Sequence, residues 1–360
     1  MKPRLFVLAF VLGVLTAGTR TGFAQQSAPS LPQQDTSYVD ADGTAYVYRI
    51  VPMPQTVSPQ AQKYLTKPVP HPGPGAGVQE NRASTDAMQA HDSALNLAMY
   101  PVNIANSIVA GVPVLIVTPV DPIPPEKADR VLICLHGGGF TTDSGSRTES
   151  IPIAHLAQTK VVSVLYRLAP EHPFPAAVDD SVAVYKELLH TYKPQHIAIY
   201  GASAGGILTA EVAAEIKQLG LPMPGALGIF TGSGDFSTVG DSSSIYSVVG
   251  LATHTTPTKG GGPWISAYVG STDPKDPILS PLYSDLHGMP PTLFLTSTRD
   301  MMLSGTAILH RAFLRAGDDA QLVVFEALTH GFWYEAGLPE SQEADQLIAH
   351  FFDVHLAASR

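Results

Sequence analysis

Residues 199–206 read IYGASAGG and place Ser203 at the centre of a G-x-S-x-G pattern. The preceding residues 196–200 are mostly apolar and predict a short buried strand, whereas residues 207–219, rich in Ala, Ile and Leu, predict a helix. A serine on so tight a turn between strand and helix takes a strained backbone conformation, which small neighbours make sterically possible. The pattern therefore predicts a serine hydroxyl held clear of the backbone at the end of a strand.

Short apolar runs rich in Val and Ile recur beyond residue 111, and helical stretches separate most of them. The runs are Val112–Val117, Arg130–Leu135, Val161–Tyr166, His196–Tyr200, Ala226–Phe230, Thr292–Thr296 and Gln321–Phe325. Residues 177–192 carry apolar side chains at helical spacing. This alternation predicts an α/β fold with a mostly parallel central sheet and helices on both faces. Residues 81–99 also have a helical composition, and the sequence leaves open whether they form a flap or a helix packed on the domain.

The first 24 residues predict a secretory signal peptide. Lys2 and Arg4 form a basic start, Leu5–Ala17 is an apolar stretch too short for a membrane span, and small residues precede a cleavage point after Ala24. We therefore expect an exported protein, periplasmic or secreted, with no stable membrane anchor after cleavage. An uncleaved N-terminal anchor is the alternative.

The composition limits the classes of partner. The chain of 360 residues is 44% hydrophobic, which is enough for a large core, and its net charge of −10 argues against a nucleic-acid partner. The single cysteine, Cys134, excludes an intrachain disulfide, and its apolar neighbours predict a buried packing role. No dinucleotide-binding or P-loop pattern follows a predicted strand, so we expect no nucleotide cofactor.

A glycine run follows the second apolar run and suggests donors for a negatively charged oxygen. Residues 136–140 read HGGGF. The backbone N–H groups of Gly138 and Gly139, together with that of Ala204 after Ser203, could form an oxyanion hole. A merely flexible loop is the alternative interpretation, but a loop needs no such run directly after a buried strand.

The sequence also offers an acid and a base for Ser203. Asp300 follows the run at 292–296, and His330 follows the run at 321–325. The chain order Ser, Asp, His is typical of an α/β-hydrolase, in which His330 would take the serine proton and Asp300 would orient the imidazole. Other acids are weaker candidates because they follow a predicted strand less directly or lie too early on its loop, and other histidines are weaker because they precede the last predicted strand. These residues are Asp276, Asp285, Glu326, His287 and His310.

Several motifs carry a family resemblance. They are HGGG at 136–139, YRLAPE at 166–171 with FPAA at 174–177, SPLY at 280–283 with MPPT at 289–292, and HGF at 330–332. From about residue 112 to the C-terminus the chain resembles the hormone-sensitive-lipase-like family of α/β-hydrolases, the bacterial family IV esterases. Two departures stand out. Ala202 occupies a position that is usually Asp or Thr in the family, and residues 297–303 read STRDMML where D-P-L-x-D is frequent.

The resemblance implies hydrolysis of short- to medium-chain carboxylic esters by a Ser-His-Asp acyl-enzyme mechanism, without metal or organic cofactor. The substrate would be a small-molecule ester. It also implies a helical cap, formed by part of the N-terminal region and by a segment at about 242–269. With the signal peptide at 1–24, the expected division is then a lead-in and part of the cap at 25–110 and a catalytic domain at 111–360. An amidase, deacetylase or lactonase could use the same site, and a non-catalytic ligand-binding protein could use the same fold.

Overall fold

The computed structural model describes residues 36–67, 77–238, 240–251 and 263–356. The expected signal peptide and the middle of the expected cap segment lie outside these ranges. The chain divides into two units at Met53. The described part of the first unit contains a hairpin of β1 (Tyr38–Val39) and β2 (Ala45–Tyr46), whose Tyr38 and Tyr46 rings stack 4.6 Å apart.

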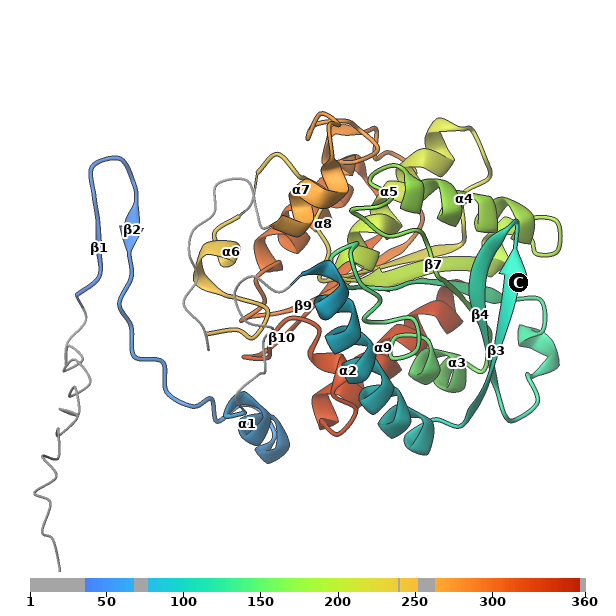
Figure 1. The fold of residues 1–360 in the computed structure, drawn as a ribbon, viewed down its shortest axis with the longest axis horizontal. Helices are drawn as coiled ribbons and strands as arrows, with labels where there is room; N and C mark the ends of the chain where they lie inside the picture. The colour runs from blue at the N-terminus through green and yellow to red at the C-terminus, as the bar shows by residue number, and fades with distance from the viewer. Residues whose placement is uncertain (1–35, 68–76, 239, 252–262, 357–360) are drawn as a thin grey trace, which may run out of the picture. The chain divides into compact units, whose positions relative to one another are not determined.

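The second unit contains one mixed sheet, which has eight strands in the described residues (Figure 1). They are β3 (Val102–Val109), β4 (Val112–Pro119), β5 (Val131–Leu135), β6 (Lys160–Val164), β7 (Ile197–Ala202), β8 (Ala226–Phe230), β9 (Thr292–Ser297) and β10 (Ala320–Phe325). Their order across the sheet is β10-β9-β8-β7-β5-β6-β4-β3. All neighbours from β10 to β6 are parallel, and β4 runs antiparallel to both of its neighbours. The predicted α/β fold is thereby confirmed, and each predicted apolar run overlaps a strand.

Helices cover both faces of this sheet, as Figure 1 shows with α4 and α5 on one side and α3 and α9 on the other. The helices are α1 (Pro59–Leu65), α2 (Val78–Met99), α3 (Ile151–Ala157), α4 (Ala176–Leu188), α5 (Ala204–Gln218), α6 (Ser242–Ile245), α7 (Pro263–Val269), α8 (Leu303–Ala316) and α9 (Pro339–His355). Short 3₁₀ turns are η1 (Pro125–Lys127), η2 (Pro194–His196), η3 (Pro281–Tyr283) and η4 (Phe332–Tyr334).

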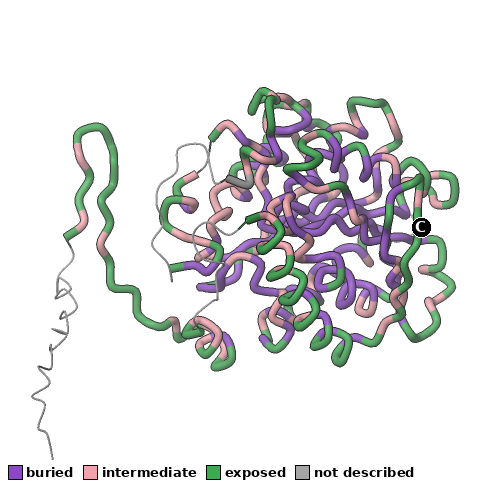
Figure 2. The backbone as a smooth tube through the Cα atoms, in the orientation of Figure 1, coloured by how far each residue is buried: buried purple, intermediate pink, exposed green. Residues whose placement is uncertain are grey.

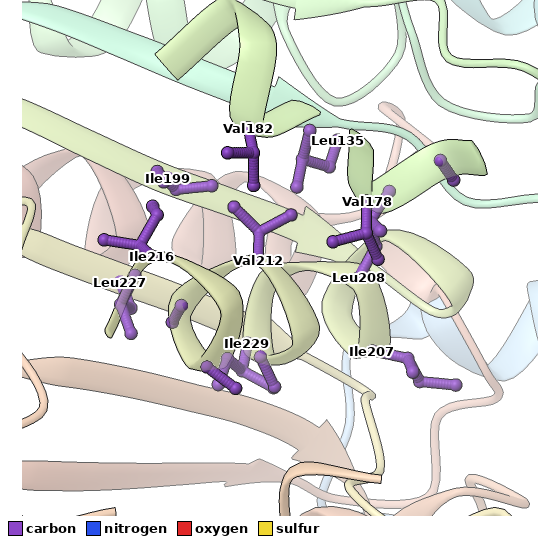
Figure 3. Close-up of a cluster of buried hydrophobic side chains, with 14 of the residues drawn as sticks. Leu135, Val178, Val182, Ile199, Ile207, Leu208, Val212, Ile216, Leu227 and Ile229 are labelled. Atoms are coloured by element: carbon purple, nitrogen blue, oxygen red, sulfur yellow. The ribbon is translucent and has the colours of Figure 1, made fainter. Parts of the chain in front are cut away.

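Strands β5, β7 and β8 are almost entirely apolar because both of their faces are buried (Figure 2). In β5, Ile133 and Leu135 face the cluster that includes α4, α5 and α8, whereas Leu132 and Cys134 face the cluster that includes α3 and α9. Figure 3 shows the first cluster, where Val212 of α5 lies among side chains from α4 and the strands. This two-sided burial fixes the register of the central strands.

Helix α2 is attached to the loop that follows the glycine run. The Arg82 Nε atom donates to the Thr141 carbonyl at 2.8 Å, and its guanidinium pairs with Glu171 at 2.7 Å. The Gln89 amide nitrogen donates to the Asp143 carbonyl at 3.0 Å. Of the two alternatives for residues 81–99, these contacts favour a helix packed on the domain.

A buried hydrogen bond holds α7 on the core. The Tyr268 hydroxyl donates to Oε2 of Glu211 at 2.6 Å, and the Tyr268 ring stacks on Phe140 with 3.5 Å between ring centroids. Both side chains of the hydrogen bond are almost fully inaccessible to solvent. Burial raises the pKa of Glu211 well above its usual range, which favours the protonated form of this side chain.

We therefore predict that Glu211 makes the fold less stable as pH rises. Above about pH 4.3, the pKa of an unfolded glutamate, the folded chain keeps a proton that the unfolded chain has released, so the free energy of unfolding falls with pH. Glu211→Gln keeps an acceptor for Tyr268 without a titratable group. Urea unfolding at pH 5 and pH 8 should show the variant gaining on the wild type by up to about 1.4 kcal/mol per pH unit. Parallel curves for the two proteins would contradict this.

Candidate active site

The turn between β7 and α5 holds Ser203 in an uncommon backbone conformation. Its φ is +57° and its ψ is −121°, outside the regions that a residue with a side chain normally adopts. The Ser203 N–H donates to the Phe230 carbonyl at 2.9 Å, and its own carbonyl accepts from Ile207 at 3.0 Å. The turn is thus held from the neighbouring strand and from the helix that it begins, as the sequence predicts for a strained nucleophilic serine.

Glycines on both sides of Ser203 allow the turn to pack against the end of β5. A side chain at Gly201 or at Gly205 would collide with the Leu135 carbonyl oxygen. Leu135 is the last residue of β5 and lies opposite Gly201 in the sheet. The serine turn and the glycine run therefore start side by side at the same edge of the sheet.

The structure brings Ser203, His330 and Asp300 together. The Nε2 atom of His330 lies 2.8 Å from the Ser203 hydroxyl oxygen, and its Nδ1 atom lies 2.8 Å from Oδ1 of Asp300. Asp300 is 1% exposed, and the His330 side chain is 8% exposed. A hydroxyl, an imidazole and a buried carboxylate in this series can transfer the serine proton to the imidazole while the carboxylate stabilises the resulting imidazolium.

The glycine run adopts conformations that require glycine. Gly138 has a φ of +114° and Gly139 a φ of +59°. A side chain at Gly138 would also collide with the Thr142 carbonyl. The loop therefore has a defined conformation that requires glycine, which favours the interpretation from the HGGG motif over a merely flexible loop. The use of the Gly138, Gly139 and Ala204 N–H groups as an oxyanion hole stays a prediction.

The other candidate residues have contacts of their own elsewhere. The His136 ring stacks on Tyr166 at 4.1 Å and contacts the Gly137 carbonyl, so it stabilises its own loop. Asp285 pairs with Lys217 and His287. The remaining candidates bond to nearby loops and strands: Asp276 to the amides of Ile278 and Leu279, His310 to the Ala320 carbonyl, and Glu326 to Thr298. Within the described ranges, no His, Cys, Asp or Glu side chains form a group of three or more that could hold a metal ion.

Comparison with known proteins agrees with this geometry. Residues 132–334 match the family described by the α/β-hydrolase fold. The chain belongs to this family.

Individual relatives place this α/β-hydrolase among the hormone-sensitive-lipase-like esterases. It is 30% identical to an esterase of Acinetobacter venetianus over 62% of this chain and 75% of the relative, and 29% identical to an acetyl-hydrolase of Streptomyces hygroscopicus over 63% and 77%. Its structure is similar to that of esterase E25, with a TM-score of 0.76 and 32% identity over 87% of this chain and 99% of E25. It is also similar to the structure of an esterase from the bacterial hormone-sensitive lipase family, with a TM-score of 0.71 and 28% identity over 83% of this chain and 99% of that esterase. The resemblance seen in the motifs is confirmed.

Two threonines that the sequence reading did not identify complete the surroundings of Asp300 in this esterase. Thr296 donates to Oδ2 of Asp300 at 2.8 Å, and the Thr231 hydroxyl donates to the same oxygen. The Met302 N–H donates to Oδ1 at 2.8 Å. Together with His330, these groups give the two oxygens of Asp300 four donors, which suit a carboxylate.

Thr231 is the less expected of the two threonines. It directly follows β8, has a φ of +47° and is fully buried, although a β-branched residue with positive φ is a genuine outlier. Its hydroxyl oxygen also lies 3.2 Å from Nδ1 of His330. One feature of the sequence points to Thr231. It directly follows a predicted strand, and the loops that carry Ser203, Asp300 and His330 also follow predicted strands.

A tyrosine from the N-terminal part of the chain reaches the histidine loop. The Tyr64 hydroxyl, on α1, lies 2.7 Å from the hydroxyl of Thr329, the residue before His330. Ser58, at the start of the same helix, hydrogen-bonds to Glu340 through its N–H and its hydroxyl. The histidine loop is therefore held from a segment that is more than 200 residues away in sequence.

We predict that the Thr231 hydroxyl contributes to turnover. Thr231→Val keeps the shape of the side chain but removes a hydrogen bond to a charged group, and kcat should fall about tenfold or more. Thr231→Ser is the matched control, because it keeps the hydroxyl and should stay within about threefold of the wild type. Steady-state kinetics with a p-nitrophenyl ester measures both. A fully active, folded valine variant would show that the hydroxyl contributes nothing.

Proposed function

We propose that this carboxylesterase cleaves short- to medium-chain acyl esters through an acyl-enzyme on Ser203. The observation that carries the proposal is the pair of 2.8 Å contacts that links Ser203, His330 and Asp300. Each of these side chains lies in the loop after a different strand of the parallel sheet, where functional groups of this type of fold gather.

The proposed reaction has two halves. The Ser203 oxygen attacks the ester carbonyl carbon while its proton passes to Nε2 of His330, and Asp300 holds the proton on Nδ1. The N–H groups of Gly138, Gly139 and Ala204 stabilise the developing oxyanion. The alcohol leaves with the proton from His330. Water then attacks the acyl-enzyme and gives a proton to His330, which passes it to the Ser203 oxygen as the carboxylic acid leaves.

The substrate class is drawn from the relatives and the motifs. Two relatives are named acetyl-hydrolases, one from Streptomyces hygroscopicus and one from Mycobacterium tuberculosis, which supports a small acyl group. Amides, lactones and acetylated sugars could be cleaved by the same groups, because each presents a carbonyl to the same nucleophile. The substrate is therefore proposed as a small-molecule ester with a short or medium acyl chain.

We predict that Ser203→Ala abolishes ester hydrolysis. Loss of the nucleophile should lower kcat by at least about a thousandfold, because only binding and oxyanion contacts remain. A fluorophosphonate probe should label wild-type Ser203, as peptide mass spectrometry can determine. Retained activity in the variant, or a label on another residue, would overturn the mechanism.

A substrate panel with the wild type tests the class of substrate in the same assay. The panel contains p-nitrophenyl esters from acetate to decanoate, a p-nitroanilide, a lactone and an acetylated sugar. The proposal expects the highest kcat/KM among the short and medium esters. Faster turnover of the anilide, the lactone or the sugar would replace it with the corresponding alternative.

We also propose that the protein is exported and that residues 1–24 are removed. The basic start, the short apolar stretch and the small residues before Gln25 support this. In the described residues, no helix is both long and apolar enough to cross a membrane.

The prediction is that the full chain, expressed in a bacterium with a secretion system, yields a mature protein beginning at Gln25 in the periplasm or the medium. N-terminal sequencing and cell fractionation measure this. An intact N-terminus in the membrane fraction would instead indicate an uncleaved anchor.

A further inference from the structure

Glu149 is a buried carboxylate close to the site that the proposed mechanism does not use. It lies two residues before α3 and is 4% exposed. Its Oε1 atom accepts from the Gly137 N–H at 2.9 Å and from the Tyr334 hydroxyl at 2.6 Å. Its Oε2 atom accepts from the Ala202 N–H at 3.0 Å. Both oxygens of one side chain are thus used to bind three donors.

These three donors belong to three of the four loops that carry the proposed chemistry. Gly137 directly precedes the proposed oxyanion donor Gly138, and Ala202 directly precedes Ser203. Tyr334 lies in η4, four residues after His330. The first two segments follow β5 and β7, which pair in the sheet, and the Tyr334 hydroxyl links the histidine loop to the same carboxyl group.

The surrounding residues leave space for the carboxyl group and hold its backbone. A side chain at Gly145 would collide with Oε1 of Glu149. The Glu149 N–H donates to the Gly145 carbonyl at 2.8 Å, and the Glu149 carbonyl accepts from the Tyr200 hydroxyl at 3.0 Å. Neighbouring residues therefore fix the backbone of Glu149 and leave a space that its carboxyl group fills.

Burying the carboxyl group of Glu149 carries a desolvation penalty. The pKa of Glu149 is raised to about 8, chiefly by burial and to a smaller extent by Asp143, although the hydrogen bonds from Tyr334, Gly137 and Ala202 oppose the rise. An apolar side chain at this point would avoid the desolvation penalty but would leave two buried N–H groups without a partner. The carboxyl group is thus kept where three separate loops need an acceptor.

We propose that Glu149 is a positioning residue that joins the oxyanion loop, the serine turn and the histidine loop into one rigid site. This inference rests on the proposed function of Ser203, His330 and Gly138. Ala202 has no polar side chain, but its backbone N–H donates to Glu149 and so links the start of the serine turn to this carboxyl group. Glu149 acts through these loops and does not contact the substrate.

Glu149→Gln is the direct test. An amide has one acceptor oxygen and one donor nitrogen, so whichever way it is turned, its NH₂ group meets a backbone N–H of Gly137 or Ala202. The loops must shift to relieve this contact, and a small misplacement of reacting groups lowers kcat by about tenfold to a hundredfold. KM should stay within about twofold, because the residue does not contact the substrate.

Two further variants separate positioning from general stability. Tyr334→Phe removes one of the three donors and should lower kcat less, and the double variant should lose less than the product of the two single effects, because the two side chains share one contact. Glu211→Gln is the matched control. It makes the same change in an equally buried glutamate that contacts Tyr268 instead of the three loops, and its kcat should equal that of the wild type.

The outcomes are distinguishable. A folded Glu149→Gln enzyme with wild-type kcat would overturn the inference, as would equal losses of kcat in Glu149→Gln and Glu211→Gln. If Glu149→Gln does not fold, an unchanged kcat in Tyr334→Phe overturns it instead. A failure of the proposed function is a different result, since Ser203→Ala would then remain active whatever the Glu149 variants do.

Discussion

The close packing of the Leu135 carbonyl against the serine turn sets the geometry of the rest of the site. Because there is no room for a side chain at Gly201 or Gly205, the turn lies directly against the end of β5. The glycine run leaves the same strand end, and β5 pairs with β7 at Gly201. The serine turn and the glycine run therefore begin on two paired strands, which lie about 4.8 Å apart.

The order of the strands extends this principle to the other side chains. Across the sheet, β7, β8, β9 and β10 are consecutive neighbours. The segments that follow them carry, in the same order, Ser203, Thr231, Asp300 and His330. Thr231 thus follows the strand that separates the serine strand from the acid strand, and its hydroxyl reaches both Asp300 and His330. Parallel pairing explains why residues nearly 130 positions apart in sequence form one site, since it places all of these strand ends at one edge.

This order also explains what the sequence could predict. The apolar runs indicate strands that are buried on both faces, and the residues just beyond them include Ser203, Asp300 and His330, which the structure brings together. Strand β3 was missed because it lies at the edge and most of its residues are exposed. Glu149 and Tyr64 were missed for a different reason. Their roles depend on contacts between segments far apart in sequence, and no local pattern distinguishes them from surface residues.

The buried acids of this protein differ in the number of donors that face them, and this difference decides what each can do. Glu211 has the Tyr268 hydroxyl as its donor, and burial raises its pKa well above the usual range. Glu149 has three donors from three loops, which oppose but do not overcome the effect of burial. Asp300 has four donors, and one of them is the imidazole that must become positively charged during the proposed reaction. The four donors fix the orientation of the Asp300 carboxyl group beside His330, so that it can hold the Nδ1 proton of the imidazole during the proposed reaction.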